Sequence, residues 1–304
     1  MGNVRAFLRD LAGGFAGLWR AQRRFLRERG ARYDLVVAVG DVYGLWMALA
    51  ARRPTIFVGT AKSVYVAPYG PVERRILRAA ARVFVRDAAT AAALREHGVS
   101  AEAPGNVIVD LAQSGSQEPF AWRQAPIRIA VLPGSRTDAY GNAARLGRIV
   151  ARLDRADEIE VALSVADGLD EGKLLAAFAF PARPWHGPLG AIFAGATLAF
   201  GQAGTANEAA AASGLPVVAL ADPGRERWYR MRQRRLLGDA LVVLSHEEKS
   251  AAAELDALLA DASGLAALAR SGRERMGPPG GAAAIARAVW AMAALRRARK
   301  PDER

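Results

Sequence analysis

The chain has 304 residues, 52% of them hydrophobic and 24% charged, so it is long enough to form two domains with separate cores. The absence of cysteine excludes disulfides and cysteine-based zinc sites, and three scattered histidines (His97, His186 and His246) disfavour a metal site made of histidine alone. The net charge of +12 gathers at the two ends without any nucleic-acid-binding motif, which indicates either an anionic membrane surface or a solvated arginine-rich surface.

The first residues predict a basic amphipathic helix. Apolar side chains recur at helical spacing from Val4 to Leu26, and most of the arginines fall outside that stripe. Such a helix can lie on a bilayer surface or pack its apolar face against a core. No segment predicts a membrane-spanning helix or a cleaved signal peptide, so we expect a cytoplasmic protein, with peripheral attachment to the inner face of the membrane as an extension of that location.

Apolar runs then alternate with helical segments. Expected strands cover 34–39, 55–58, 83–85 and 101–103, and expected helices cover 43–52, 72–80 and 88–97. Unbroken apolar strands separated by helices predict a parallel sheet covered on both faces. Ligands of such sheets bind beyond the carboxyl ends of the strands. Asp41, Lys62 and Ser63 therefore stand where chemistry is expected.

The polar stretch Leu111–Pro126 predicts a linker, after which the same pattern restarts. Expected strands cover 127–132, 159–163, 197–200, 217–220 and 240–244. Expected helices include 143–153, 171–178, 226–236, 248–260, 264–273 and 282–295. This organisation predicts a first domain over 1–115, a second over 116–280, and a terminal helix with a basic tail over 281–304 that returns to the first domain.

The stretch Ala199–Leu220 has the pattern of a buried strand, a glycine turn, a short helix and a second buried strand. Gly201 and Gly204 allow the backbone to turn sharply and to approach a ligand. Two interpretations of the next residues compete. Thr205 and Glu208 can form a helix capping box, or Glu208 can bind the hydroxyls of a ribose while the glycine turn and the helix N-terminus face phosphates.

A second turn of this kind, Pro133-Gly134-Ser135-Arg136, also lies between a buried strand and a helix. Gly134 allows close approach, Ser135 can donate a hydrogen bond, and Arg136 can grip a phosphate through two parallel bonds. Alone, the turn is an ordinary strand-to-helix connection. Together with Glu208, the two turns favour one nucleotide diphosphate site. The pattern lacks the glycine fingerprint of dinucleotide enzymes and the lysine of P-loop NTPases.

Several motifs carry a resemblance to a known family. Val131–Arg136, Ala203–Glu208 and Gly105–Asp110 resemble segments of lipid-A-disaccharide synthase. The related proteins of that group are more similar still, through Val39–Tyr43, Phe57–Ser63 and the ending Arg275–Gly280. The resemblance covers most of the chain, and the combination of motifs is more specific than any one of them.

The resemblance implies an α/β fold of two Rossmann-like domains of the GT-B type, the N-terminal one truncated because the chain begins in a helix. It implies a hexosyltransferase of glycolipid biosynthesis that moves a sugar from a UDP-sugar, of the UDP-N-acetylglucosamine type, to a lipid-linked acceptor without a metal or another cofactor. Arg136 is the candidate stabiliser of the leaving diphosphate, and Asp41 is either the general base or a helix cap. The candidate substrate-binding residues are Gly134, Ser135, Arg136, Gly201, Gly204, Thr205, Asn207, Glu208, Lys62 and Ser63.

Two other functions remain open on the same fold. The first is a nucleotide-sugar epimerase of the UDP-N-acetylglucosamine 2-epimerase type, although that chemistry needs more acid and base residues than the motifs offer. The second is a non-catalytic protein that binds a nucleotide sugar at a membrane surface. Incubation with labelled UDP-sugars and a lipid extract distinguishes the three functions. Product in the lipid phase supports transfer, an isomerised free sugar supports the epimerase, and saturable binding without turnover supports the binding protein.

Overall fold

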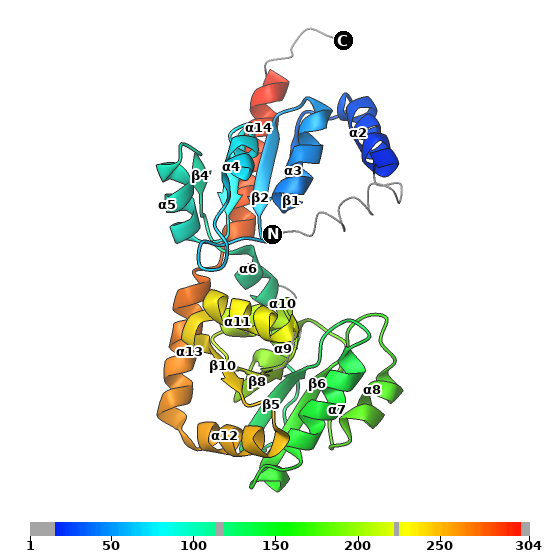
Figure 1. Cartoon of the computed structure of the whole chain (residues 1–304), viewed down its shortest axis with the longest axis vertical. Coiled ribbons are helices and arrows are strands. Elements are labelled where there is room, and N and C mark those ends of the chain that lie inside the picture. Colours follow the sequence, from blue (N-terminus) through cyan, green and yellow to red (C-terminus); the bar gives the residue numbers. More distant parts are fainter. Residues whose placement is uncertain (1–15, 114–117, 222–224, 299–304) are drawn as a thin grey trace. The chain divides into compact units, whose positions relative to one another are not determined.

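A computed structural model describes residues 16–113, 118–221 and 225–298 of the chain (Figure 1). The chain forms two compact α/β units, and the described part of unit 1 comprises residues 16–105 and 280–298. Unit 2 is Asn106–Pro279. The change of unit therefore falls after Gly105 rather than after residue 115, because helix α6 (Val107–Gln113) packs against helix α10 (Thr205–Ala212) of unit 2.

Unit 1 is built on a parallel sheet with the strand order β1-β2-β3-β4. The strands end close to their expected positions because each is a short apolar run followed by a polar or glycine-containing turn. The elements of unit 1 are α2 (Ala16–Gly30), β1 (Val36–Gly40), α3 (Val42–Ala48), the 3₁₀ turn η2 (Leu49–Ala51), β2 (Thr55–Gly59), α4 (Pro71–Leu77), β3 (Arg82–Val85), α5 (Ala88–Glu96), β4 (Ala101–Glu102) and α14 (Gly281–Ala298).

The two faces of the unit 1 sheet have separate cores. Phe57 and Val83 pack on one face with Leu45 of α3, Leu77 of α4 and Leu94 of α5. The other face, carrying Ile56, Val58 and Phe84, is covered by apolar side chains of α14, at the far end of the sequence. Helix α14 thus supplies a layer that unit 1 needs, since a parallel sheet must bury both faces.

Unit 2 contains a six-stranded parallel sheet in the described part of the chain, with the order β10-β9-β8-β5-β6-β7. Numbered within the unit, this is the Rossmann order 3-2-1-4-5-6 read from the other edge. Its elements after α6 are β5 (Ile127–Leu132), α7 (Ala139–Val150), η3 (Ala156–Glu158), β6 (Ile159–Ser164), α8 (Glu171–Phe178), β7 (Arg183–Trp185), α9 (Leu189–Phe193), β8 (Leu198–Gly201), α10, β9 (Val217–Leu220), α11 (Arg225–Leu237), η4 (Gly238–Ala240), β10 (Leu241–Leu244), α12 (Glu248–Ala260) and α13 (Ala262–Met276).

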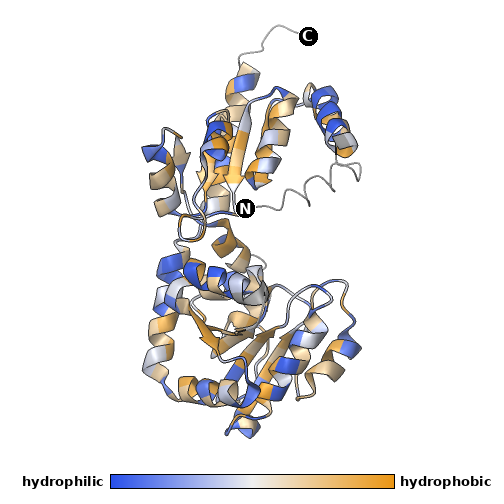
Figure 2. Ribbon diagram, viewed as in Figure 1, coloured by the Kyte–Doolittle hydropathy of each residue, from blue (hydrophilic) through white to orange (hydrophobic). Residues whose placement is uncertain are grey.

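Strand β5 shows why the central strands read as continuous apolar runs. Its residues Ile129 and Val131 enter the core formed with α7, α8 and α12. The alternate residues Ala130 and Leu132 enter the opposite core, formed with α6, α9 and α10. Both faces are buried, so no polar alternation is left in the sequence. The strands of both units accordingly appear predominantly hydrophobic in Figure 2.

Three expectations differ from the structure or lie outside it. The linker expected over Leu111–Pro126 is wrong in part, because α6 occupies its beginning and Phe120 is buried in the core of unit 2. The Trp122 indole Nε1 also donates to the Ala194 carbonyl over 2.9 Å, which ties this segment down. Strand β7 was not expected, because it is short and contains a proline. It can form because it lies at the edge of the sheet, where a proline is tolerated. The beginning of the expected N-terminal helix lies outside the described residues.

Tyr69 is buried at the carboxyl edge of the unit 1 sheet, and it predicts a pH effect on stability. Burial raises the pKa of its phenol well above the ordinary value near 10, and the charges of Glu73 and Asp87 add to the shift. As the pH rises, the Tyr69 phenol therefore loses its proton in the unfolded chain before it does so in the folded chain. Its contribution to the free energy of unfolding is complete below pH 10 and declines above it. We expect the free energy of unfolding to fall by up to about 1.4 kcal/mol per pH unit relative to Tyr69→Phe.

Urea unfolding between pH 8 and 11 measures this difference. Tyr65→Phe is the matched control, because it removes a phenol hydroxyl from the same loop at a residue that is more than one third exposed. Parallel curves for the wild type and Tyr69→Phe would contradict the prediction.

Candidate active site

The two turns singled out in the sequence lie side by side at the carboxyl edge of the unit 2 sheet. Strands β5 and β8 are parallel neighbours, and their last residues, Leu132 and Gly201, are paired. The strand order reverses direction between these two strands, which is where open α/β sheets bind ligands. Gly134 has φ +114°, a backbone conformation that favours glycine. A Cβ atom at Gly201 would lie 2.8 Å from the Cβ of Leu132, so this turn also requires glycine.

A cavity of about 430 Å³ opens between the two turns. Arg136 lines it from the first turn and Glu208 from helix α10, so both functional candidates face one space. Among the described residues, no hydrogen bond or ion pair holds the exposed Arg136 guanidinium. The cavity is lined by Pro133, Gly134, Ser135, Arg136, Asp138, Ala139, Asn142, Gln202, Ala203, Gly204, Thr205, Glu208, Tyr229 and Arg230.

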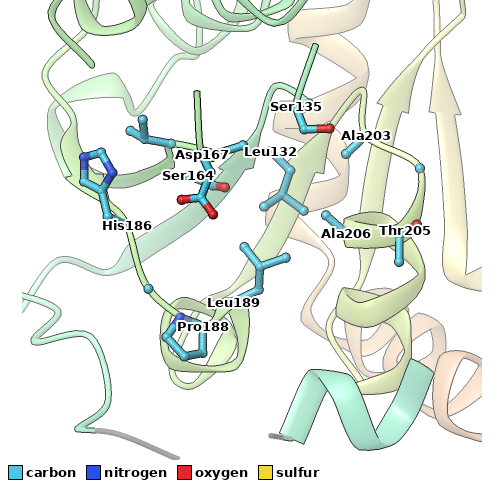
Figure 3. A pocket seen from close by; sticks show the side chains of 15 residues that line it. Leu132, Ser135, Ser164, Asp167, His186, Pro188, Leu189, Ala203, Thr205 and Ala206 are labelled. Carbon is cyan, nitrogen blue, oxygen red and sulfur yellow. The ribbon is translucent and has the colours of Figure 1, made fainter. Parts of the chain in front are cut away.

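A second cavity, of about 540 Å³, adjoins the first (Figure 3). The two share Gly134, Ser135, Ala203, Gly204 and Thr205 as walls. Figure 3 shows the second cavity between the segment carrying His186 and Pro188 on one side and Ala203, Thr205 and Ala206 on the other. Both cavities therefore lie against the paired turns, and each has the volume of a ligand pocket.

The capping-box interpretation of Thr205 and Glu208 is wrong. Helix α10 has Gly204 at its N-cap position, without a capping side chain, and Thr205 is already the first helical residue. Thr205, the residue whose side chain could cap the helix, therefore lies one position after the N-cap. Its side chain lines both cavities instead. The first amides of α10 have no partner within the helix, as at every helix N-terminus.

Side chains behind the second turn hold its carbonyl groups. Asn207 donates to the Gly201 carbonyl over 3.0 Å. Gln233, on helix α11, donates to the carbonyls of Ala203 and Gly204 over 3.2 and 3.1 Å. Because the amide and the carbonyl of a trans peptide point in opposite directions, these bonds turn the amides of Gly204 and Thr205 away from α11. The bonds from Asn207 and Gln233 thus fix the direction of the peptide groups of this turn.

Arg230 connects the same helix to the cavity wall. Its side chain is only 4% exposed, yet it lines the smaller cavity. It donates to the Gln202 side-chain oxygen over 2.8 Å and to the Gln202 carbonyl over 3.3 Å, and it also bonds the amide oxygen of Gln233. Arg230 and Arg136 thus line the same cavity, together with the carboxylates of Asp138 and Glu208.

The resemblance implies a UDP-sugar at this site, and on that expectation we predict that Gln233→Leu weakens the binding of UDP by about tenfold. Two carbonyls lose their donors, and the amides of the turn lose their fixed direction. Isothermal titration calorimetry of the full chain with UDP measures the effect. Ser213→Ala is the matched control, since the Ser213 hydroxyl donates to the Ala209 carbonyl over 3.0 Å at the other end of α10. Equal losses in both variants would contradict a specific role for Gln233.

Asp41, Lys62 and Ser63 lie in unit 1, at the carboxyl edge of its sheet. Asp41 caps α3 by accepting from the Gly44 amide over 3.0 Å. Lys62 forms an ion pair with Glu73 at 2.7 Å. Ser63 is 2% exposed and its hydroxyl accepts from the Tyr65 amide over 3.3 Å. Each of the three therefore has a local structural role, and the exposed Asp41 carboxylate is the one most open to a reactant.

Sequence reasoning missed the residues that α11 and the neighbouring loops contribute to the cavities. Helix α11 was expected only as a helix over 226–236, and nothing in its arginine-rich sequence marked Arg230 as a buried side chain. The described residues contain no group of three or more histidine, aspartate or glutamate side chains that could hold a metal ion. In the same part of the chain, no helix is long and apolar enough to cross a bilayer.

Comparison with known proteins supports the architecture. Neither a family model nor a curated protein sequence matches the chain. Among solved structures, UDP-GlcNAc 2-epimerase from Neisseria meningitidis, bound to UDP-GlcNAc, is similar with a TM-score of 0.62 at 13% identity, over 90% of this chain and 80% of that one. MurG from Acinetobacter baumannii gives 0.59 at 15% identity, over 88% and 77% of the two chains. CalG4, the calicheamicin glycosyltransferase, gives 0.60 at 17%, over 90% and 76%.

These likenesses show the fold. The chain has two Rossmann-like α/β units of the GT-B type, as the motifs led us to expect. Glycosyltransferases and epimerases stand side by side among the similar structures, so the fold does not separate the two activities. That distinction depends on the residues of the site.

Proposed function

We propose that the chain is a metal-independent glycosyltransferase that moves a sugar from a UDP-sugar, of the UDP-N-acetylglucosamine type, to a lipid-linked acceptor. The observation that carries the proposal is the single cavity lined by both Arg136 and Glu208, at the switch point of the unit 2 sheet. The relation to lipid-A-disaccharide synthase belongs to the same proposal and rests on the sequence motifs.

The unit 2 site offers complementary groups to each part of the donor. Arg136, Ser135 and the amides of Gly204 and Thr205 can bind the diphosphate, and the Glu208 carboxylate can accept bonds from the ribose hydroxyls. The adjoining cavity beyond Ser135 leaves room for the remainder of the nucleotide sugar. These groups stabilise the charge that develops on the departing diphosphate, which is the task that a metal ion performs in other transferases.

We assign the acceptor side to unit 1 and to Asp41. The acceptor hydroxyl attacks the anomeric carbon of the sugar as the bond from that carbon to the diphosphate oxygen breaks, so UDP leaves with the electron pair. Asp41 takes the hydroxyl proton as general base. Lys62 and Ser63 shape the loop beside it through their bonds to Glu73 and Tyr65. A lipid-linked acceptor places the reaction at the inner face of a membrane.

The test is a turnover assay with the full chain, UDP-N-acetylglucosamine labelled in the sugar, and a lipid extract. We expect label in the lipid phase and an equal amount of released UDP. Labelled sugar that is isomerised but stays in the water phase would support the epimerase and overturn transfer. Saturable binding of the UDP-sugar without either product would support a non-catalytic binding protein.

A further inference from the structure

Helices α2 and α3 leave an apolar surface open to solvent on unit 1. A groove of about 530 Å³ lies between them, and the wall atoms exposed in it are almost entirely apolar. Phe25, which lines the groove, and Leu18, two helical turns earlier on α2, are each 58% exposed. We call this surface the α2–α3 patch; it comprises Leu18, Ala21, Gln22, Phe25, Leu26, Tyr43, Gly44, Trp46 and Met47.

Aromatic stacking holds one side of the patch in place. The rings of Trp19 and Trp46 stack with their centroids 5.5 Å apart, and Tyr43 lies 6.1 Å from Trp46. The Arg23 guanidinium lies 5.0 and 5.3 Å from the two tryptophan ring centroids. The exposed parts of Tyr43 and Trp46 are therefore presented by a packed cluster rather than by free side chains. Tyrosine and tryptophan favour boundaries between an apolar phase and water.

The charge of helix α2, which forms one wall of the patch, is predominantly positive. Helix α2 carries five arginines and one glutamate, Glu28, whose carboxylate pairs with Arg24 at 2.7 Å. The exposed arginines of the helix are Arg20, Arg24, Arg27 and Arg29. A helix with exposed Leu and Phe side chains and an arginine-rich polar side has the composition of helices that lie in the interface of an anionic bilayer.

We propose that the α2–α3 patch docks unit 1 onto an anionic lipid bilayer, with Phe25 and Leu18 entering the acyl region and the arginines binding headgroup phosphates. The groove accepts acyl carbons between α2 and α3. The charge of the helix selects this occupant over an uncharged apolar partner. The biological role of this docking rests on the proposed function, because a lipid-linked acceptor lies in such a bilayer. The docking itself needs neither donor nor acceptor.

Vesicle flotation with the full chain tests the proposal. The vesicles contain either phosphatidylcholine alone or equal parts of phosphatidylcholine and phosphatidylglycerol. We expect binding to the anionic vesicles only, declining with salt because the attraction is screened. Each of the substitutions Arg20→Gln, Arg24→Gln and Arg27→Gln should lower the partition coefficient by about fivefold. Phe25→Ser should lower it by about tenfold through the lost apolar burial.

Two matched controls lie on α4 of the same unit. Val72 is 73% exposed and Arg75 is exposed, both outside the patch, so Val72→Ser and Arg75→Gln should leave binding unchanged. Equal binding to both kinds of vesicle, or equal losses in the patch and control variants, would overturn the proposal. So would self-association in solution, measured by light scattering, that Phe25→Ser abolishes, because the patch would then bind a second copy. UDP titration of the same variants shows separately whether the donor site is intact.

Discussion

Arg136→Ala lowers the affinity of the chain for UDP by about 10- to 100-fold, the loss expected when a charged hydrogen-bonding group no longer meets a phosphate. The affinity of this variant for uridine stays unchanged, since uridine has no phosphate. The prediction follows from the position of Arg136, which lines the cavity with an exposed guanidinium and no bonding partner among the described residues. Calorimetric titration with both ligands measures the two affinities.

Glu208→Ala gives the complementary pattern. It weakens the binding of both UDP and uridine, because both contain the ribose hydroxyls. A ligand with neither hydroxyl, 2′,3′-dideoxy-UDP, binds as tightly as to the wild type.

Arg152→Ala is the matched control for Arg136→Ala, since Arg152 is an arginine of the same unit that pairs with Glu248 at 3.5 Å on the surface. If Arg136→Ala weakens uridine as much as UDP, the residue supports the fold and not the phosphate site.

Of the donor site, the two strand-to-helix turns could be predicted from the sequence. The alternation of strands and helices predicts a parallel sheet, in which the turns at Gly134 and Gly201 lie at the same edge. That their strands β5 and β8 are neighbours could not be predicted, since these strands are not consecutive in the sequence. The helix cap was misjudged for a reason of register. A spacing of three residues between Thr205 and Glu208 fits a capping box only when the helix begins after Thr205, and here it begins at that residue.

The support behind the site could not be predicted in the same way. Gln233 reaches the turn from a helix almost thirty residues further along the chain, and no local pattern links a glutamine to the carbonyls of Ala203 and Gly204. Helix α11 has arginines all around it, so its sequence has no apolar stripe to show which side is buried. Phe120 was assigned to a linker for a related reason, because one aromatic residue in a polar stretch does not set a period.

Asp41 offers the sharper test of chemistry, because its two interpretations respond differently to one substitution. Serine caps helices about as well as aspartate, so Asp41→Ser should keep the bond from the Gly44 amide and change the free energy of unfolding little. Asp41→Ala should lose the cap and about 1 kcal/mol. Both variants lose the carboxylate. If that carboxylate is the general base, both lower the rate of sugar transfer by about 10²- to 10⁴-fold and leave the affinity for UDP unchanged.

The matched control comes from unit 2, where Asp261 caps helix α13 by accepting from the Gly264 amide over 2.8 Å, with the same spacing as Asp41 and Gly44. Asp261→Ser should therefore leave both stability and transfer unchanged. Asp41→Ser with full transfer activity would reduce Asp41 to a cap, because the substitution preserves the helix start and removes only the base. In that case the proton acceptor must be sought among the other polar side chains at the carboxyl edge of the unit 1 sheet. Asp87, which caps α5 and lies near enough to Tyr69 to raise its pKa, is the first of these to test.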